Sequence, residues 1–167
     1  LSETVKEQIK TDICIVGAGP GGCTAALQLA QHNVNCLLVD KASFPRDKIC
    51  GDALSGKVVE VVRKVEPAII DQFAHQPTQL GSWGVNFTAP NGKVLRVPFK
   101  QQYNKLEEQP PGFIAKRIDF DHYLLEQTLQ YPQVEFRQEL TVTAHQYQPD
   151  GLVLQTAEGT SIHCQIA

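Results

Sequence analysis

The sequence predicts an α/β fold in which a βαβ unit is followed by an antiparallel insertion and then by a β-meander. Three observations predict this order. A glycine-rich turn joins a buried strand to a helix near the N-terminus, the hydrophobic period changes to two at about residue 83, and turn residues separate the last strands. With 167 residues, the chain is long enough for one ordinary domain with its own core.

The βαβ unit is expected at residues 12–39. Residues 12–16 are apolar and β-branched, as in a buried parallel strand, residues 21–31 show the small and apolar faces of a helix, and residues 34–39 supply the next strand. Asn33 ends the helix, because Asn tolerates the left-handed conformation found at helix ends. The crossover between the two parallel strands should be right-handed.

The middle of the chain is expected to pass from a loop to a helix and then to a β-hairpin. A polar loop at residues 40–56 precedes residues 58–65, which have helical spacing although their valines also suit a strand. Pro67 interrupts this helix, which resumes at residues 68–73. Residues 83–99 then alternate as in a hairpin, and Asn91-Gly92 predicts a type I′ turn at its tip.

The last third returns to mixed structure. After a polar loop, residues 112–117 form a short strand and residues 120–130 an amphipathic helix, whose apolar face holds Phe120, Leu124, Leu125 and Leu129. Strands are expected at 134–137, 140–148, 151–157 and 160–166. Short turns join the last three strands, so these form a meander.

The turn after the first strand has the spacing G-x-G-x-x-G, with Gly17, Gly19 and Gly22. The first glycine permits the tight turn, the second lets a pyrophosphate approach the backbone, and the third lets the helix pack close to the strand. The helix N-terminus then offers N–H groups to phosphate, and Pro20 stands where a missing N–H costs little. Asp40 ends the second strand, where an acid favours a ribose with a free 2′-OH. This motif predicts binding of an ADP moiety and does not separate NAD from FAD.

Two further blocks carry a resemblance to a known family. The pattern P-x-x-K-x-C-G-x-x-x-S is matched by Pro45, Lys48, Cys50, Gly51 and Ser55, and R-x-x-F-D-x-x-L is matched by Arg117, Phe120, Asp121 and Leu124. The first block resembles the geranylgeranyl reductase family of FAD-dependent oxidoreductases, which have the p-hydroxybenzoate hydroxylase type of fold. The second block is similar to a strand-to-helix element found across the same flavoprotein superfamily.

The resemblance implies FAD as the cofactor and a division of the chain into three parts. Residues 1–80 would be a Rossmann-like FAD-binding part, residues 81–111 part of an inserted antiparallel sheet on the substrate side, and residues 112–167 a return to the FAD-binding domain. The expected cofactor contacts are Gly17, Ala18, Gly19, Pro20, Gly21, Gly22, Asp40, Lys41, Lys48, Cys50, Gly51, Asp52, Ala53 and Arg117.

Single side chains in these blocks keep two interpretations. Cys50 is the candidate catalytic residue, for proton delivery or positioning, yet Cys50-Gly51 also suits a small pair that lets the loop pass close to the flavin. Lys48 and Arg46 either neutralise phosphate or are ordinary loop charges, and the second interpretation is favoured for Arg46. Arg117 would be a surface residue but for the motif.

The resemblance implies that a reduced flavin delivers hydride to a carbon–carbon double bond of a prenyl or other apolar substrate, with NAD(P)H as a candidate electron donor. The alternatives are a flavin-dependent monooxygenase or halogenase and, in another class, a non-catalytic escort of prenylated proteins. A plain NAD-binding module would leave the CGDALS loop unexplained.

Composition excludes several other functions. The net charge of −3 gives no basic field for nucleic acid, and no apolar run is long enough to span a bilayer. Without a signal peptide the protein is expected in the cytoplasm, with peripheral membrane contact left open. The five cysteines lack metal-site spacing, and Cys14, Cys23 and Cys36 are expected to be buried. The absence of methionine and the abrupt C-terminus suggest a fragment of a longer protein.

Overall fold

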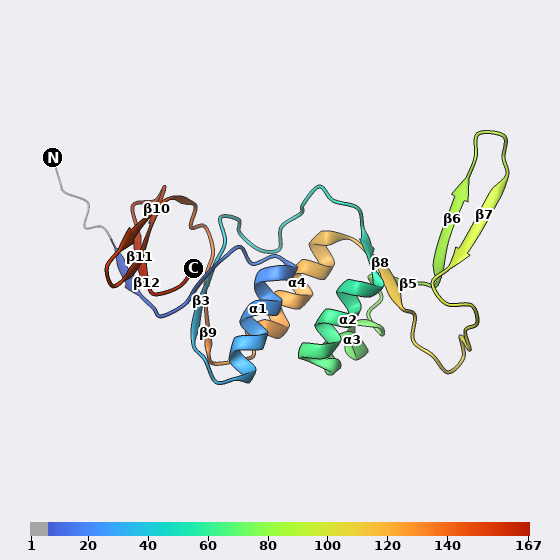
Figure 1. Cartoon of the computed structure of the whole chain (residues 1–167), viewed down its shortest axis with the longest axis horizontal. Helices are drawn as coiled ribbons and strands as arrows, with labels where there is room; N and C mark the ends of the chain where they lie inside the picture. Colours follow the sequence, from blue (N-terminus) through green and yellow to red (C-terminus); the bar gives the residue numbers. More distant parts are fainter. Residues whose placement is uncertain (1–6) are drawn as a thin grey trace. The chain divides into compact units, whose positions relative to one another are not determined.

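The computed structural model describes residues 7–167, which separate into two compact units (Figure 1). Unit 1 combines the chain up to Asp47 with Asp121–Ala167, and unit 2 is the continuous segment Lys48–Phe120. Each unit is described by itself below. Every helix within residues 7–167 is too short or too polar to cross a membrane.

Unit 1 contains the predicted βαβ unit. Strands β2 (Cys14–Val16) and β3 (Cys36–Val39) pair in parallel, with Cys14 opposite Leu37, and β9 (Val134–Arg137) extends the same sheet in the order β2-β3-β9. All four residues of β3 are buried, as expected for the central strand of a parallel sheet. Helix α1 (Pro20–Gln31) connects β2 to β3 and buries Cys23, Ala26, Leu27 and Ala30. Asn33 has φ +56°, which confirms its predicted role at the helix end.

A second sheet of unit 1 contains the predicted meander. Strands β10 (Val142–Gln148), β11 (Gly151–Thr156) and β12 (Ser161–Cys164) pair antiparallel in sequence order. Strand β1 (Gln8–Lys10), which the sequence analysis missed, adds to β12 in parallel, with Gln8 opposite Ser161. Its three residues are too few to show a period, so pairing with a distant strand fixes it rather than local preference.

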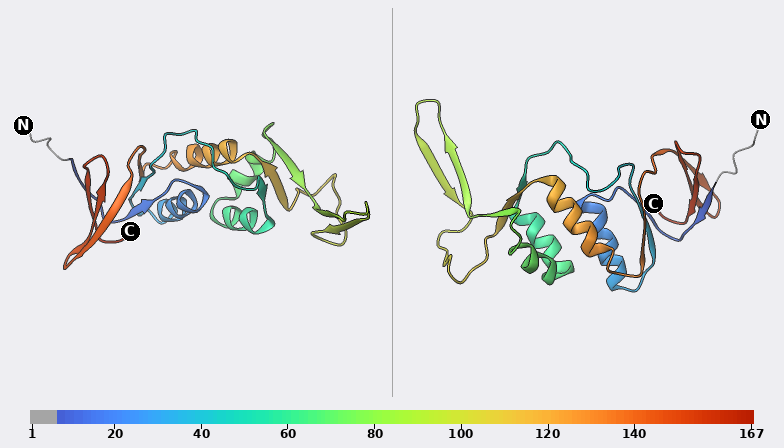
Figure 2. Two further views of the ribbon diagram at one scale, coloured as in Figure 1. Left: turned by 90° about the horizontal axis from the view of Figure 1, so that it is seen from above. Right: turned by 180° about the vertical axis from the view of Figure 1, so that it is seen from behind.

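Helix α4 (Arg117–Thr128) begins three residues before the predicted start. Arg117, which was expected on the strand before it, is therefore the first residue of the helix. Phe120, Leu124 and Leu125 are buried as predicted, whereas Leu129 lies beyond the helix end and is 42% exposed. Both views in Figure 2 show α4 beside α1, and Thr128 of α4 forms a hydrogen bond with the Cys23 side chain of α1.

Unit 2 is built on a small antiparallel sheet in the order β4-β8-β5, comprising β4 (Ala53–Leu54), β8 (Gly112–Ala115) and β5 (Gln79–Ser82). The sequence analysis missed β4 and β5. Helices α2 (Gly56–Val65) and α3 (Pro67–Phe73) lie between them in sequence, which confirms the helical interpretation of the valine-rich segment. The core is aromatic, because the ring of Phe73 meets Phe113 and Phe120 edge-on at 5.5 and 5.2 Å.

The predicted hairpin is present as β6 (Gly84–Thr88) and β7 (Val94–Pro98), visible in Figure 2. The predicted type I′ turn is wrong. Such a turn needs positive φ at both central residues, and here Gly92 has φ +79° while Asn91 does not have a positive φ. The Gly92 N–H instead donates to the Ala89 carbonyl at 2.9 Å, which places Pro90 at the position where its fixed φ favours a turn.

Candidate functional site

The glycine-rich turn of unit 1 runs from the end of β2 into α1. Gly17 has φ +108°, a conformation that favours glycine, and its N–H donates to the carbonyl of Val39 on the neighbouring strand at 2.7 Å. A Cβ atom on Gly22 would lie 1.8 Å from the Gly17 carbonyl oxygen. Gly22 is therefore required for close approach of the helix to the turn, as its place in the motif predicts.

The N-terminus of α1 is open to an anion. Gly19 is the N-cap and supplies no capping side chain, Pro20 follows, and the first turn carries no acidic residue. Cβ atoms added to Gly17 or Gly21 would meet no other atom within 4 Å. The first turn thus combines backbone N–H groups, the positive end of the helix dipole and open space, which are the requirements for binding phosphate.

Asp40, at the end of β3, is held against this turn. Its Oδ2 accepts a hydrogen bond from the Ala18 N–H at 2.7 Å, and its Oδ1 accepts one from the Ala42 N–H at 2.9 Å. Asp40 is only 8% exposed and these two bonds fix the orientation of its carboxylate, while each oxygen retains a further lone pair. Lys41, the next predicted contact, is exposed.

Beneath the turn, Cys23 supports the backbone. Its thiol donates to the Ala18 carbonyl at 3.3 Å and is fully buried. Burial raises the pKa of the Cys23 thiol to about 12, so the group stays protonated as a hydrogen-bond donor. Cys14, Cys36 and Cys164 are also buried, whereas Cys50 is exposed. The burial predicted for Cys14, Cys23 and Cys36 is confirmed.

For Arg46, the favoured interpretation as an ordinary loop charge is wrong. Its side chain is only 16% exposed, and its Nη1 donates to Oδ2 of the fully buried Asp121 at 2.9 Å. Its Nη2 lies 3.3 Å from the position that a Cβ on Gly19 would take. Asp121 is the residue from which the sequence could have predicted this ion pair, because a carboxylate on the buried side of a predicted helix requires a partner.

The remaining predicted contacts belong to unit 2. Lys48, Cys50 and Gly51 lie in a loop before β4, where Cys50 is exposed. Asp52 accepts a hydrogen bond at its carbonyl from the Ala115 N–H at 2.9 Å, and Ala53 pairs with Ile114 of β8. Arg117 begins α4 two residues beyond β8. Asp52 and Ala53 of the second block therefore lie beside β8, the strand that precedes Arg117 in the chain.

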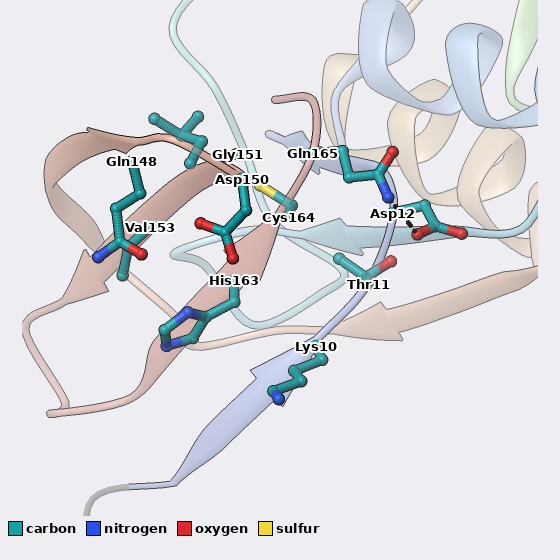
Figure 3. A pocket seen from close by; sticks show the side chains of 11 residues that line it. Lys10, Thr11, Asp12, Gln148, Asp150, Gly151, Val153, His163, Cys164 and Gln165 are labelled. Atoms are coloured by element: carbon teal, nitrogen blue, oxygen red, sulfur yellow. Dashed lines mark hydrogen bonds between the residues drawn. The ribbon is translucent and has the colours of Figure 1, made fainter.

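A cavity of about 420 Å³ lies elsewhere in unit 1, on the four-stranded sheet (Figure 3). It is lined by residues of β1, of the β10–β11 turn and of β12, among them Lys10, Asp150 and His163. Gln165 closes one side by donating to Asp12 at 3.3 Å. None of the predicted contacts lines this cavity, so it is not the nucleotide site that the motif predicts.

Comparison with known proteins identifies the family. A family model described as an FAD binding domain matches residues 10–166. The chain belongs to this FAD-binding domain family. The comparison confirms the flavoprotein assignment made from the sequence, and it is broader than the geranylgeranyl reductase resemblance.

Reductases are among the curated relatives. The chain is 35% identical over 108 residues to a menaquinone reductase of Mycobacterium tuberculosis, covering 58% of this chain and 26% of the relative. It is 28% identical over 118 residues to digeranylgeranylglycerophospholipid reductase 2 of Methanosphaera stadtmanae, covering 70% of this chain and 27% of the relative. The matched part thus spans about a quarter of the length of these relatives.

Solved structures show the same fold. A flavoprotein/dehydrogenase from Cytophaga hutchinsonii has a TM-score of 0.74 at 21% identity, covering 94% of this chain and 38% of that chain. A myxobacterial chondrochloren halogenase, an FAD-dependent halogenase, has a TM-score of 0.74 at 23% identity, covering 95% of this chain and 36% of that chain. The predicted α/β fold of an FAD-binding domain is therefore confirmed.

The residues of unit 1 fit the cofactor that the family implies. The uncapped first turn of α1 and the space beside Gly17 and Gly21 suit a pyrophosphate, and the oriented Asp40 carboxylate suits a ribose hydroxyl. The individual contacts stay predictions, including those from Lys41, Lys48 and Arg117.

Proposed function

We propose that the protein is an FAD-dependent oxidoreductase that reduces carbon–carbon double bonds of an isoprenoid substrate. The observation that carries the FAD assignment is the open N-terminus of α1 within a chain that belongs to the FAD-binding domain family. The narrower choice of a reductase rests on the block from Pro45 to Ser55 and on the menaquinone and digeranylgeranylglycerophospholipid reductases among the curated relatives.

The residues of unit 1 would bind and orient the adenosine half of FAD. The first turn of α1 would hold the pyrophosphate, and Gly17 and Gly21 leave it room. Asp40 would accept a hydrogen bond from the ribose, and the Ala18 and Ala42 N–H groups hold its carboxylate in place before the cofactor arrives. Such preorganisation lowers the entropic cost of binding.

In the proposed reaction, the bound cofactor, once reduced by two electrons, would supply the hydride that adds to one carbon of the double bond and would return to oxidised FAD. The other carbon needs a proton, and the exposed thiol of Cys50 is the candidate donor or positioning group on this chain. NAD(P)H is the proposed source of the two electrons. Because the proposed substrate is apolar, peripheral contact of the protein with a membrane is also part of the proposal.

The second candidate function is that of a flavin-dependent halogenase or monooxygenase. It is favoured by the sequence likeness to a tryptophan 2-halogenase of Chondromyces crocatus, 32% identical over 118 residues, and the likeness to the chondrochloren halogenase adds support at the level of fold. The two candidates differ in whether reduced flavin reacts productively with dioxygen. A reductase should convert its substrate under anaerobic conditions, whereas a halogenase or monooxygenase should require oxygen.

The first experiment is an absorption spectrum of the purified full-length protein, together with identification of the released nucleotide. Flavin bands between about 300 and 550 nm with released FAD would support the cofactor assignment. Prenyl substrates would then be tested with dithionite-reduced protein, with and without oxygen. A protein that stays colourless after incubation with FAD would sink the enzyme proposal and favour a non-catalytic escort of prenylated proteins.

A further inference from the structure

We infer that Arg46, held by the buried carboxylate of Asp121, is a second binding element for the cofactor pyrophosphate, in addition to the first turn of α1. This inference rests on the proposed binding of FAD at that turn. Of the two interpretations that the sequence left open for Arg46, it selects phosphate neutralisation over the ordinary loop charge that was favoured there.

The first support is the position of the guanidinium. Nη2 lies 3.3 Å from where a Cβ of Gly19 would stand, and Gly19 is the N-cap of α1. The cation is therefore next to the backbone N–H groups that the phosphates would meet. Gly19 consequently has two reasons to lack a side chain, since a Cβ there would crowd the arginine as well as the ligand.

The second support is the way in which the guanidinium is held. Nη1 donates to Asp121 at 2.9 Å, and the guanidinium carbon lies 5.1 Å from the centre of the Phe44 ring. Asp121 is fully buried in α4, so the carboxylate is a fixed anchor rather than a mobile surface group. An arginine with one edge fixed in this way is oriented before an anion binds, which lowers the cost of using it.

The third support is charge. A pyrophosphate diester carries two negative charges, and the helix N-terminus supplies only partial positive charge. Asp40 and Asp121 bring two carboxylates close to the turn. Asp40 accepts a hydrogen bond from the Ala18 N–H, and the negative charge of each acid contributes to the raised pKa of the Cys23 thiol. A full positive charge from Arg46 offsets this local negative charge and makes the turn more favourable for phosphate.

The test compares Arg46→Ala with Arg46→Lys in the full-length protein. The dissociation constant for FAD would be measured by quenching of flavin fluorescence, at about 50 and about 500 mM NaCl. We expect Arg46→Ala to weaken FAD binding by about 10- to 100-fold at low salt, as for loss of a charge-assisted hydrogen bond. The variant should also lose most of the salt dependence of the wild type, and Arg46→Lys should recover part of both.

Two controls separate a binding role from a structural one. Arg137→Ala removes an arginine of the same unit that pairs with Glu135 on the surface, and should leave FAD binding unchanged. The double variant Arg46→Met, Asp121→Leu replaces the buried pair by apolar side chains, which proteins often tolerate without loss of stability. It should fold and still bind FAD weakly, with a flat salt dependence.

The outcomes distinguish this inference from the proposed function. If Arg46→Ala and the double variant bind FAD as the wild type does, or bind it more weakly with unchanged salt dependence, the inference is wrong and the cofactor assignment stands. If the wild-type protein itself fails to bind FAD, the proposed function fails and the inference fails with it.

Discussion

Substitution of the third glycine of the turn by alanine gives the sharpest test of the geometry of unit 1. The added methyl group of Gly22→Ala would stand 1.8 Å from the Gly17 carbonyl oxygen and 3.2 Å from Cγ2 of Ile15. Because the nearer atom belongs to the backbone, the turn must move by roughly 1 Å or more. Comparable overpacking costs about 2 kcal/mol of unfolding free energy, or roughly 4–8 °C in Tm for a chain of this size.

The matched control is Gly21→Ala, in the preceding position of the same helix. A Cβ there meets no other atom within 4 Å, so alanine should stabilise the cofactor-free protein by about 0.5 kcal/mol through its helix propensity. Both variants would be compared with the wild type by urea unfolding followed by circular dichroism. Equal stability of the two variants, or a less stable Gly21→Ala, would refute the close approach of helix and turn.

Three further outcomes are expected. In the native protein at about pH 8, Cys50 should be the single thiol among the five that reacts rapidly with a disulfide reagent, since the others are buried; release of a second thiol without denaturant would contradict this. Stability should fall as the pH rises from about 9, by about 1.4 kcal/mol per pH unit for each of Cys14 and Cys23. Burial raises the pKa of both thiols to about 12, so above the ordinary thiol pKa the unfolded state loses protons that the folded state keeps. The urea midpoint of a Cys14→Val, Cys23→Ala variant should therefore fall less steeply with pH than that of the wild type. If the midpoints of the two proteins fall equally steeply, the two thiols are not the cause of the pH dependence. Finally, Gly92→Ala should cost about 1 kcal/mol because its φ is +79°, whereas Gly92→Asn should cost less, as judged from thermal unfolding; the reverse order would contradict the turn assignment.

The parts of the fold that the sequence predicts well are those with a local cause. Strand β3 is a continuous apolar run, and the spacing of Val59, Val62 and Val65 outweighs the strand preference of valine. Strands β1, β4 and β5 were missed because each has two to four residues and exists through pairing with a partner distant in sequence. The turn of the hairpin was misassigned because Pro90 decides its geometry, rather than the Asn91-Gly92 pair.

For the candidate site, the sequence predicts the glycine turn and Asp40 because strand, turn and helix follow each other directly. For Arg46, the sequence left phosphate neutralisation and an ordinary loop charge open and favoured the second. The importance of Arg46 depends on Asp121, which is 75 residues away along the chain and is brought near only by the fold. The roles of Cys50 and Arg117 stay predictions, since they depend on a ligand rather than on contacts within the chain.

The pairing of β1 with β12 has a consequence for how the protein is made. Gln8 meets Ser161, so the second sheet of unit 1 cannot close until nearly all of the described chain has left the ribosome. At about 5–20 residues per second, β1 waits roughly 8–30 s for its partner, whereas unit 2 is continuous and can fold in the meantime. During synthesis, the segment that precedes the glycine turn therefore has an unpaired strand edge, the feature that chaperones and wrong partners both recognise.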